Sequence, residues 1–108
     1  MAMLEKVIPE DLDALAQRIR QGILGNSVSA TLEEDARYRA GDARCAVLVF
    51  ERYSYIGGNR VSMNVTLFQA GDGPVQLCAV TSGGSRAVLF KINTVGEENF
   101  LLDLEEIL

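Results

Sequence analysis

The sequence predicts an α+β fold, in which an antiparallel β-meander of about five strands is flanked by an N-terminal and a C-terminal helix. Apolar residues follow a helical period near both ends of the chain and alternate with polar residues in the middle. Two Gly-Gly pairs, Gly57-Gly58 and Gly83-Gly84, separate the apolar runs of the middle part. Tight turns between consecutive strands require antiparallel pairing. We expect one domain over residues 1–108, with both helices on one face of the sheet.

The first helix is predicted within residues 9–26, PEDLDALAQRIRQGILGN. Pro9 suits the first helical position, and Gly25-Asn26 is a typical end signal. Apolar residues recur along it at spacings of three and four, at Leu12, Leu15, Ile19 and Ile23. This spacing predicts one buried face.

The first strand is predicted at residues 27–33, SVSATLE, where apolar and hydroxyl residues alternate. The acidic segment that follows, from Glu33 to Asp42, is predicted to be a solvated loop. A divalent cation bound by its carboxylates is the alternative.

The second and third strands are predicted in CAVLVFER and VSMNVTLF, joined by a turn at Gly57-Gly58. This register pairs Phe50 with Val65 and Leu48 with Leu67 on the buried face. On the other face it pairs Tyr55 with Arg60, Tyr53 with Ser62, and Glu51 with Asn64. A four-residue loop keeps the register, whereas a three-residue loop would bury Glu51.

A second hairpin is predicted around Gly83-Gly84, with Leu77 opposite Phe90 and the fifth strand over residues 86–92. A helix that begins at Ser85 is the alternative, because short apolar runs fit either structure.

The C-terminal helix is predicted to begin at residues 94–97, TVGE, which read as a capping box. An apolar stripe follows, at Phe100, Leu101, Leu104, Ile107 and Leu108.

The composition excludes several kinds of function. The chain has no histidine, so Ser-His-Asp and Cys-His nucleophile systems and histidine metal ligands are excluded. Its net charge of −5 argues against binding to nucleic acids or to anionic membranes. No apolar run approaches the ~18 residues that span a membrane, and the N-terminus does not resemble a secretory signal. We expect a cytoplasmic protein without cofactor or metal.

The two cysteines, Cys45 and Cys78, are predicted to be free thiols. In the expected sheet they lie on the same face, on strands separated by a third strand. Two strand spacings are about 9–10 Å, beyond the ~7 Å between Cα atoms that a disulfide tolerates.

Three segments, GILGNSVSATLEE, CAVLVFERYSYIGGNRVSMNVTL and AVTSGGSRAVLFKINTVGEENFL, resemble a family of small bacterial proteins, domain of unknown function 6054. The resemblance extends from about Ile23 to Leu104. It implies a small bacterial cytoplasmic protein, and it implies no activity, cofactor or site residue.

The first functional hypothesis is an interaction module that forms a homodimer through one sheet face. The face assigned away from the core is too apolar for open water. It carries Val47, Val49, Tyr53, Phe68, Cys78, Val80, Ala87 and Leu89. A helix covering each face of the sheet is the intramolecular alternative.

The second hypothesis is a small-anion site at the end of the sheet where the Gly-Gly turns meet. Its candidate residues are Tyr55, Asn59, Arg60, Ser82, Ser85 and Arg86. Glu51 is the nearest carboxylate that can neutralise Arg60 instead. The third hypothesis is an enzyme that uses Glu51 with Tyr53 or Tyr55, although no complete catalytic set can be assembled.

Overall fold

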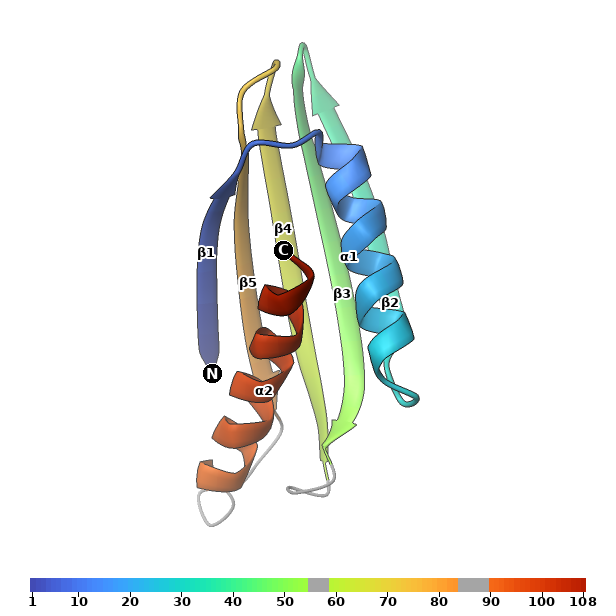
Figure 1. Cartoon of the computed structure of the whole chain (residues 1–108), viewed down its shortest axis with the longest axis vertical. Coiled ribbons are helices and arrows are strands. Elements are labelled where there is room, and N and C mark those ends of the chain that lie inside the picture. The colour runs from blue at the N-terminus through green and yellow to red at the C-terminus, as the bar shows by residue number, and fades with distance from the viewer. Residues whose placement is uncertain (55–58, 84–89) are drawn as a thin grey trace.

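The computed structural model describes residues 1–54, 59–83 and 90–108. Figure 1 shows a layer of antiparallel strands with both helices packed on one of its faces. In chain order the elements are β1 (Ala2–Ile8), α1 (Leu12–Asn26), β2 (Thr31–Ala40), β3 (Ala43–Ser54), β4 (Asn59–Ala70), β5 (Val75–Gly83) and α2 (Phe90–Ile107). The strand order of the five-stranded sheet is β1-β5-β4-β3-β2. The expected fold class is therefore confirmed.

The predicted hairpin at Gly83-Gly84 is wrong. Leu77 pairs with Lys6 of β1, and Phe90 is the first residue of α2. The sheet position beside β5 is filled by β1, so the chain after β5 has no free strand edge to join. The sequence pattern missed β1 because apolar residues occur on both of its sides. The competing prediction of a helix in this region is nearer to the structure, although its start at Ser85 lies outside the described residues.

The register between β3 and β4 differs by two residues from the predicted one. Phe50 pairs with Met63, and Leu48 pairs with Val65. Because side chains alternate with a period of two, this shift leaves every side chain on its predicted face. Residues 57 and 58, where the turn was predicted, lie outside the described residues.

The acidic segment predicted as a loop is instead most of β2. It pairs with β3 through a two-residue connection, Gly41-Asp42, in which Gly41 has a φ of +60°. A positive φ at the first central position is typical of a type II′ hairpin turn. Charged residues occur here because β2 is an edge strand, where they oppose pairing with another chain.

The C-terminal helix begins earlier than predicted, since Thr94 lies inside α2 and cannot cap it. Glu97, the other half of the predicted capping box, is only 3% exposed. Its carboxylate forms an ion pair with the N-terminal ammonium of Met1. This contact ties the start of β1 to α2.

The core lies between the sheet and the two helices. Along β3, β4 and β5 every second residue is buried, and α1 buries its predicted apolar face. The largest fully buried side chains include Phe50, Phe100, Leu12, Leu15 and Met63.

The two helices come into close contact at Gly22 of α1. A Cβ atom built at this position would lie 2.5 Å from Cδ1 of Ile107. The absence of a side chain at Gly22 thus lets the end of α2 pack against α1.

A buried glutamine fixes the start of α1 on the sheet. Gln69 is 4% exposed, and both polar atoms of its side chain are hydrogen-bonded. Its Oε1 accepts from the backbone N–H of Leu12 at 2.9 Å and from Arg44 at 2.5 Å. Its Nε2 donates to the carbonyls of Glu10 at 3.0 Å and Gly73 at 2.7 Å. One side chain therefore joins β4, α1 and the β4–β5 turn.

Arg44 extends this network to the first turn of α1. Its guanidinium donates to Asp11 at 2.9 Å and to Asp13 at 2.8 Å. Asp11 is the N-cap and accepts from the backbone N–H groups of Asp13 and Ala14. The hydrogen bond from Arg44, followed by that from Ala14, holds the pKa of the Asp11 carboxyl below its ordinary value.

We expect Gln69→Leu to lower the free energy of unfolding by about 2–4 kcal/mol, because buried backbone groups of Leu12 and Gly73 lose their partners. Urea unfolding followed by circular dichroism measures the change. Gln17→Leu, the same substitution at an exposed position of α1, is the control and should change stability little. Equal stability of the two variants would contradict the structural role of Gln69.

Stability should also fall in acid because of Asp11. A carboxyl whose pKa is depressed on folding contributes stability above its unfolded pKa of about 4, and this is lost as the pH falls through the lower folded value. We expect the unfolding midpoint of the wild type to drop more steeply between about pH 5 and pH 3 than that of Asp11→Asn, which can still cap the helix. Asp72→Asn, at an exposed turn position, should behave like the wild type.

Candidate functional site: the open face of the sheet

One face of the sheet is left uncovered. Among the described residues, α1 contacts β2, β3 and β4, while α2 contacts β1, β4 and β5. Both helices lie on the same side of the strands (Figure 1). The alternative of one helix on each face is therefore wrong, and we call the uncovered side the open face.

The open face has an apolar corner on β2, β3 and β4, near the β2–β3 turn. Cross-strand pairing sets its residues side by side, since Tyr38 pairs with Cys45 and Cys45 pairs with Phe68. The corner consists of Ala36, Tyr38, Ala40, Ala43, Cys45, Val47, Phe68 and Ala70. No charged residue projects from the corner on this face.

A shallow hollow of about 120 Å³ lies within the apolar corner. The surface that it exposes is mostly apolar, and the arginines Arg39 and Arg44 also border it. Cys45 lies between the larger side chains of Tyr38 and Phe68, and Ala40 and Ala43 lie beside them toward the β2–β3 turn. These two rings are 64% and 41% exposed, so each protrudes beside a patch of small residues.

The other end of the open face is polar. Arg60 forms an ion pair with Glu51, with Nε and Oε1 2.8 Å apart. The hydroxyls of Ser62 and Ser82 lie 2.8 Å apart on neighbouring strands. The open face thus carries the apolar corner at one end and these polar groups at the other, which we call the polar end.

The sequence correctly assigned many residues to this face. The register places every described residue of the predicted apolar set on it, namely Val47, Val49, Tyr53, Phe68, Cys78 and Val80. Ala87 and Leu89 lie outside the described residues. Tyr38 and the alanines of β2 were missed, because their segment was taken for a loop; the alternation of Ala36, Tyr38 and Ala40 with arginines is the signal that could have found them.

The cysteine prediction is confirmed. Cys45 lies on β3 and Cys78 on β5, with β4 between them, and both are free.

The predicted anion-site residues fall at the polar end, but the structure describes only part of the set. Asn59 and Arg60 begin β4 and Ser82 is near the end of β5, while Tyr55, Ser85 and Arg86 lie outside the described residues. The loop after α1 also reaches this end, since Ser29 Oγ accepts from the backbone N–H of Tyr53 at 3.1 Å.

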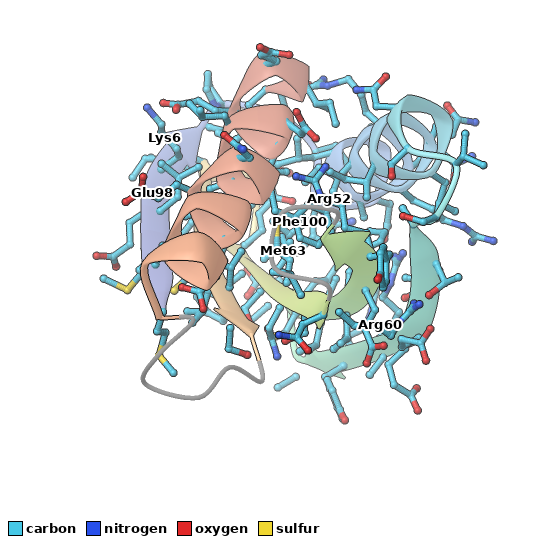
Figure 2. All side chains as sticks on the ribbon, turned by 90° about the horizontal axis from the view of Figure 1, so that it is seen from below. Lys6, Arg52, Arg60, Met63, Glu98 and Phe100 are labelled. Carbon is cyan, nitrogen blue, oxygen red and sulfur yellow. The ribbon has the colours of Figure 1, made fainter. Side chains whose placement is uncertain are left out.

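A second arginine lies at this end on the covered side of the sheet. The Arg52 guanidinium forms an ion pair with Asp103 and lies 4.4 Å from the ring centroid of Phe100. Figure 2 shows Arg52, Met63 and Phe100 gathered between the helices and the sheet, with Arg60 apart from them. Arg52 thus holds α2 against β3, a contact that sequence reasoning missed because it depends on how the helix packs.

Comparison with protein-family models shows to which family the chain belongs. The model of a family of unknown function, DUF6054, matches residues 1–108. The chain belongs to this family. The comparisons found no matching curated protein and no matching solved structure. The predicted resemblance to the DUF6054 family is therefore confirmed.

In the residues that the structure describes, neither helix of this DUF6054 chain is both long and apolar enough to cross a membrane. In the same residues, no group of three acidic or cysteine side chains is arranged to hold a metal ion. Glu51, proposed for catalysis with Tyr53 or Tyr55, forms its ion pair with Arg60.

The anion site stays a prediction, and Glu51 provides its test. A carboxylate 2.8 Å from Arg60 competes with any anion for the guanidinium. We expect phosphate or sulfate to raise the melting temperature of Glu51→Gln more than that of the wild type, because a ligand that binds the folded state stabilises it. Arg60→Ala should abolish the shift, whereas Arg20→Ala on exposed α1 should retain it. Equal shifts of the melting temperature in the wild type and in all three variants would show that no anion binds at this end.

Proposed function

We propose that the protein is a non-enzymatic interaction module whose open face binds a second copy of the same chain. The observation that carries this proposal is the packing of both helices on one face, which leaves exposed rings of Tyr38 and Phe68 on the other. Exposed apolar patches of this kind usually mark an interaction surface. Homodimers with two-fold symmetry are the most common assembly of soluble proteins.

The size of the open face supports a dimer. Strands about 4.8 Å apart and a rise of about 3.3 Å per residue give a five-stranded face of roughly 25 by 30 Å. This corresponds to an area on the order of 700 Å², close to the ~800 Å² that each partner buries in a stable complex. The whole open face therefore sets the upper limit of the area that a dimer can bury without the helices, and a contact through the apolar corner uses part of it.

The distribution of charge also supports a second copy as the partner. With a net charge of −5, two copies repel each other at long range. The carboxylates of the described open face, Glu5, Glu34 and Glu51, lie outside the apolar corner. Two copies can thus meet at this corner without placing carboxylates against each other.

We further propose that the module acts in the cytoplasm. Both cysteines are half-buried free thiols, and a reducing compartment keeps such thiols from oxidising.

Light scattering at high protein concentration should give twice the 11.8 kDa mass of one chain. Val47→Glu should reduce the mass to that of the monomer, because the dimer would bury a charge without a partner, at a cost of several kcal/mol. Val28→Glu is the control, since Val28 is fully exposed in the loop after α1 and lies outside the open face. A monomeric wild type would refute the proposal.

A further inference from the structure

We infer that Phe68 of each protomer inserts into the hollow of the apolar corner of its partner, so that two equivalent ring-in-hollow contacts anchor the dimer. This inference rests on the proposed dimer and names the contact that holds it together. It follows from the size and lining of the hollow, from the position of Phe68 and from the symmetry that self-association requires.

The hollow has the size and lining that an aromatic ring needs. Its volume of about 120 Å³ is close to that of the ~150 Å³ apolar cavity that accommodates benzene in an engineered protein. Ala43 and Cys45 form part of its lining and carry no charge. A hydrogen-bond donor of a partner would gain little binding energy in this hollow, whereas an apolar ring would displace water from an apolar surface.

Phe68 is the ring best suited to fill the hollow. It lies on β4, the central strand of the sheet, and its side chain is 41% exposed. It has no polar atom that must remain hydrated. Tyr38 lies on the edge strand β2, and its hydroxyl favours a position where one side of the ring meets water.

Symmetry identifies the partner as a second copy. A two-fold interface places the same patch of both subunits in contact, so a protruding group on the patch needs a matching hollow on that patch. Phe68 and the hollow are neighbours on the same face, since Phe68 pairs directly with Cys45. A foreign partner would have no need for both features to occur together.

An exchange of ring and hollow between variants tests this contact. Phe68→Ala removes the ring and Ala43→Phe fills the hollow, so we expect each variant alone to self-associate roughly tenfold more weakly than the wild type, or worse. In a mixture of the two, Phe68 of one chain faces the open hollow of the other, and the filled hollow faces an alanine. The heterodimer thus regains one of the two ring contacts, so we expect it to be tighter than either homodimer of the variants and weaker than the wild-type dimer, measured by sedimentation velocity with one variant labelled.

Matched controls separate this contact from general effects on the face or the fold. Val7→Ala shortens another exposed apolar residue of the open face, and Ala14→Phe adds a ring to exposed α1. Both should self-associate like the wild type. Recovery in the mixture requires folded chains, so it also excludes misfolding as the cause of the single defects.

The outcomes distinguish this inference from the proposed function. A wild type that stays monomeric at high concentration refutes the dimer, and the ring contact with it. If the wild type dimerises but the two variants associate no better together than apart, the open-face dimer stands and the insertion of Phe68 is wrong. Heterodimers that form at the expense of both homodimers establish the contact.

Discussion

The pairing of β1 with β5 decides how the rest of the chain is arranged. This contact joins segments that are far apart in the sequence, with Ala2 beside Thr81 and Ile8 beside Val75. Because β1 takes the edge beside β5, the chain that follows β5 cannot extend the sheet there. It forms α2 and returns over the same face as α1, where Gly22 allows the end of α2 to pack closely. The uncovered open face is a direct consequence.

The start of α1 is held by polar contacts. They are needed because the chain leaves the edge strand β1 and crosses the covered face to reach β2, β3 and β4. The side chain of Gln69 accepts a hydrogen bond from the backbone N–H of Leu12 in the first turn of the helix, and Arg44 neutralises the carboxylates of Asp11 and Asp13. The two hairpin turns of this end are also joined, since the backbone N–H of Gly71 donates to the carbonyl of Asp42 at 3.1 Å. Buried polar groups that are fully hydrogen-bonded specify one arrangement rather than several.

The charged and the apolar side chains of the open face are unevenly distributed. Arg60 and Glu51 neutralise each other at one end, whereas the apolar corner at the other end carries no charged side chain on this face. The charges of β2 protect an edge that would otherwise be free to pair with other strands. Association through the apolar face rather than through the edge thus fits the distribution of side chains on β2.

The sequence by itself determined the features that depend on local periodicity. These are the buried face of α1, the two faces of β3 and β4, and the separation of Cys45 from Cys78. Alternation assigns a residue to a face even when the register is wrong by two, which is why Val47 and Phe68 were placed correctly on the apolar surface. Only the tertiary structure decided that residues 2–8 form a strand and that Phe90 begins a helix. Both depend on pairing between distant segments, and a short apolar run has no local property that selects strand over helix. The hollow beside Phe68 likewise exists only because Tyr38, from a segment that reads as a loop, is brought alongside Cys45 by the fold.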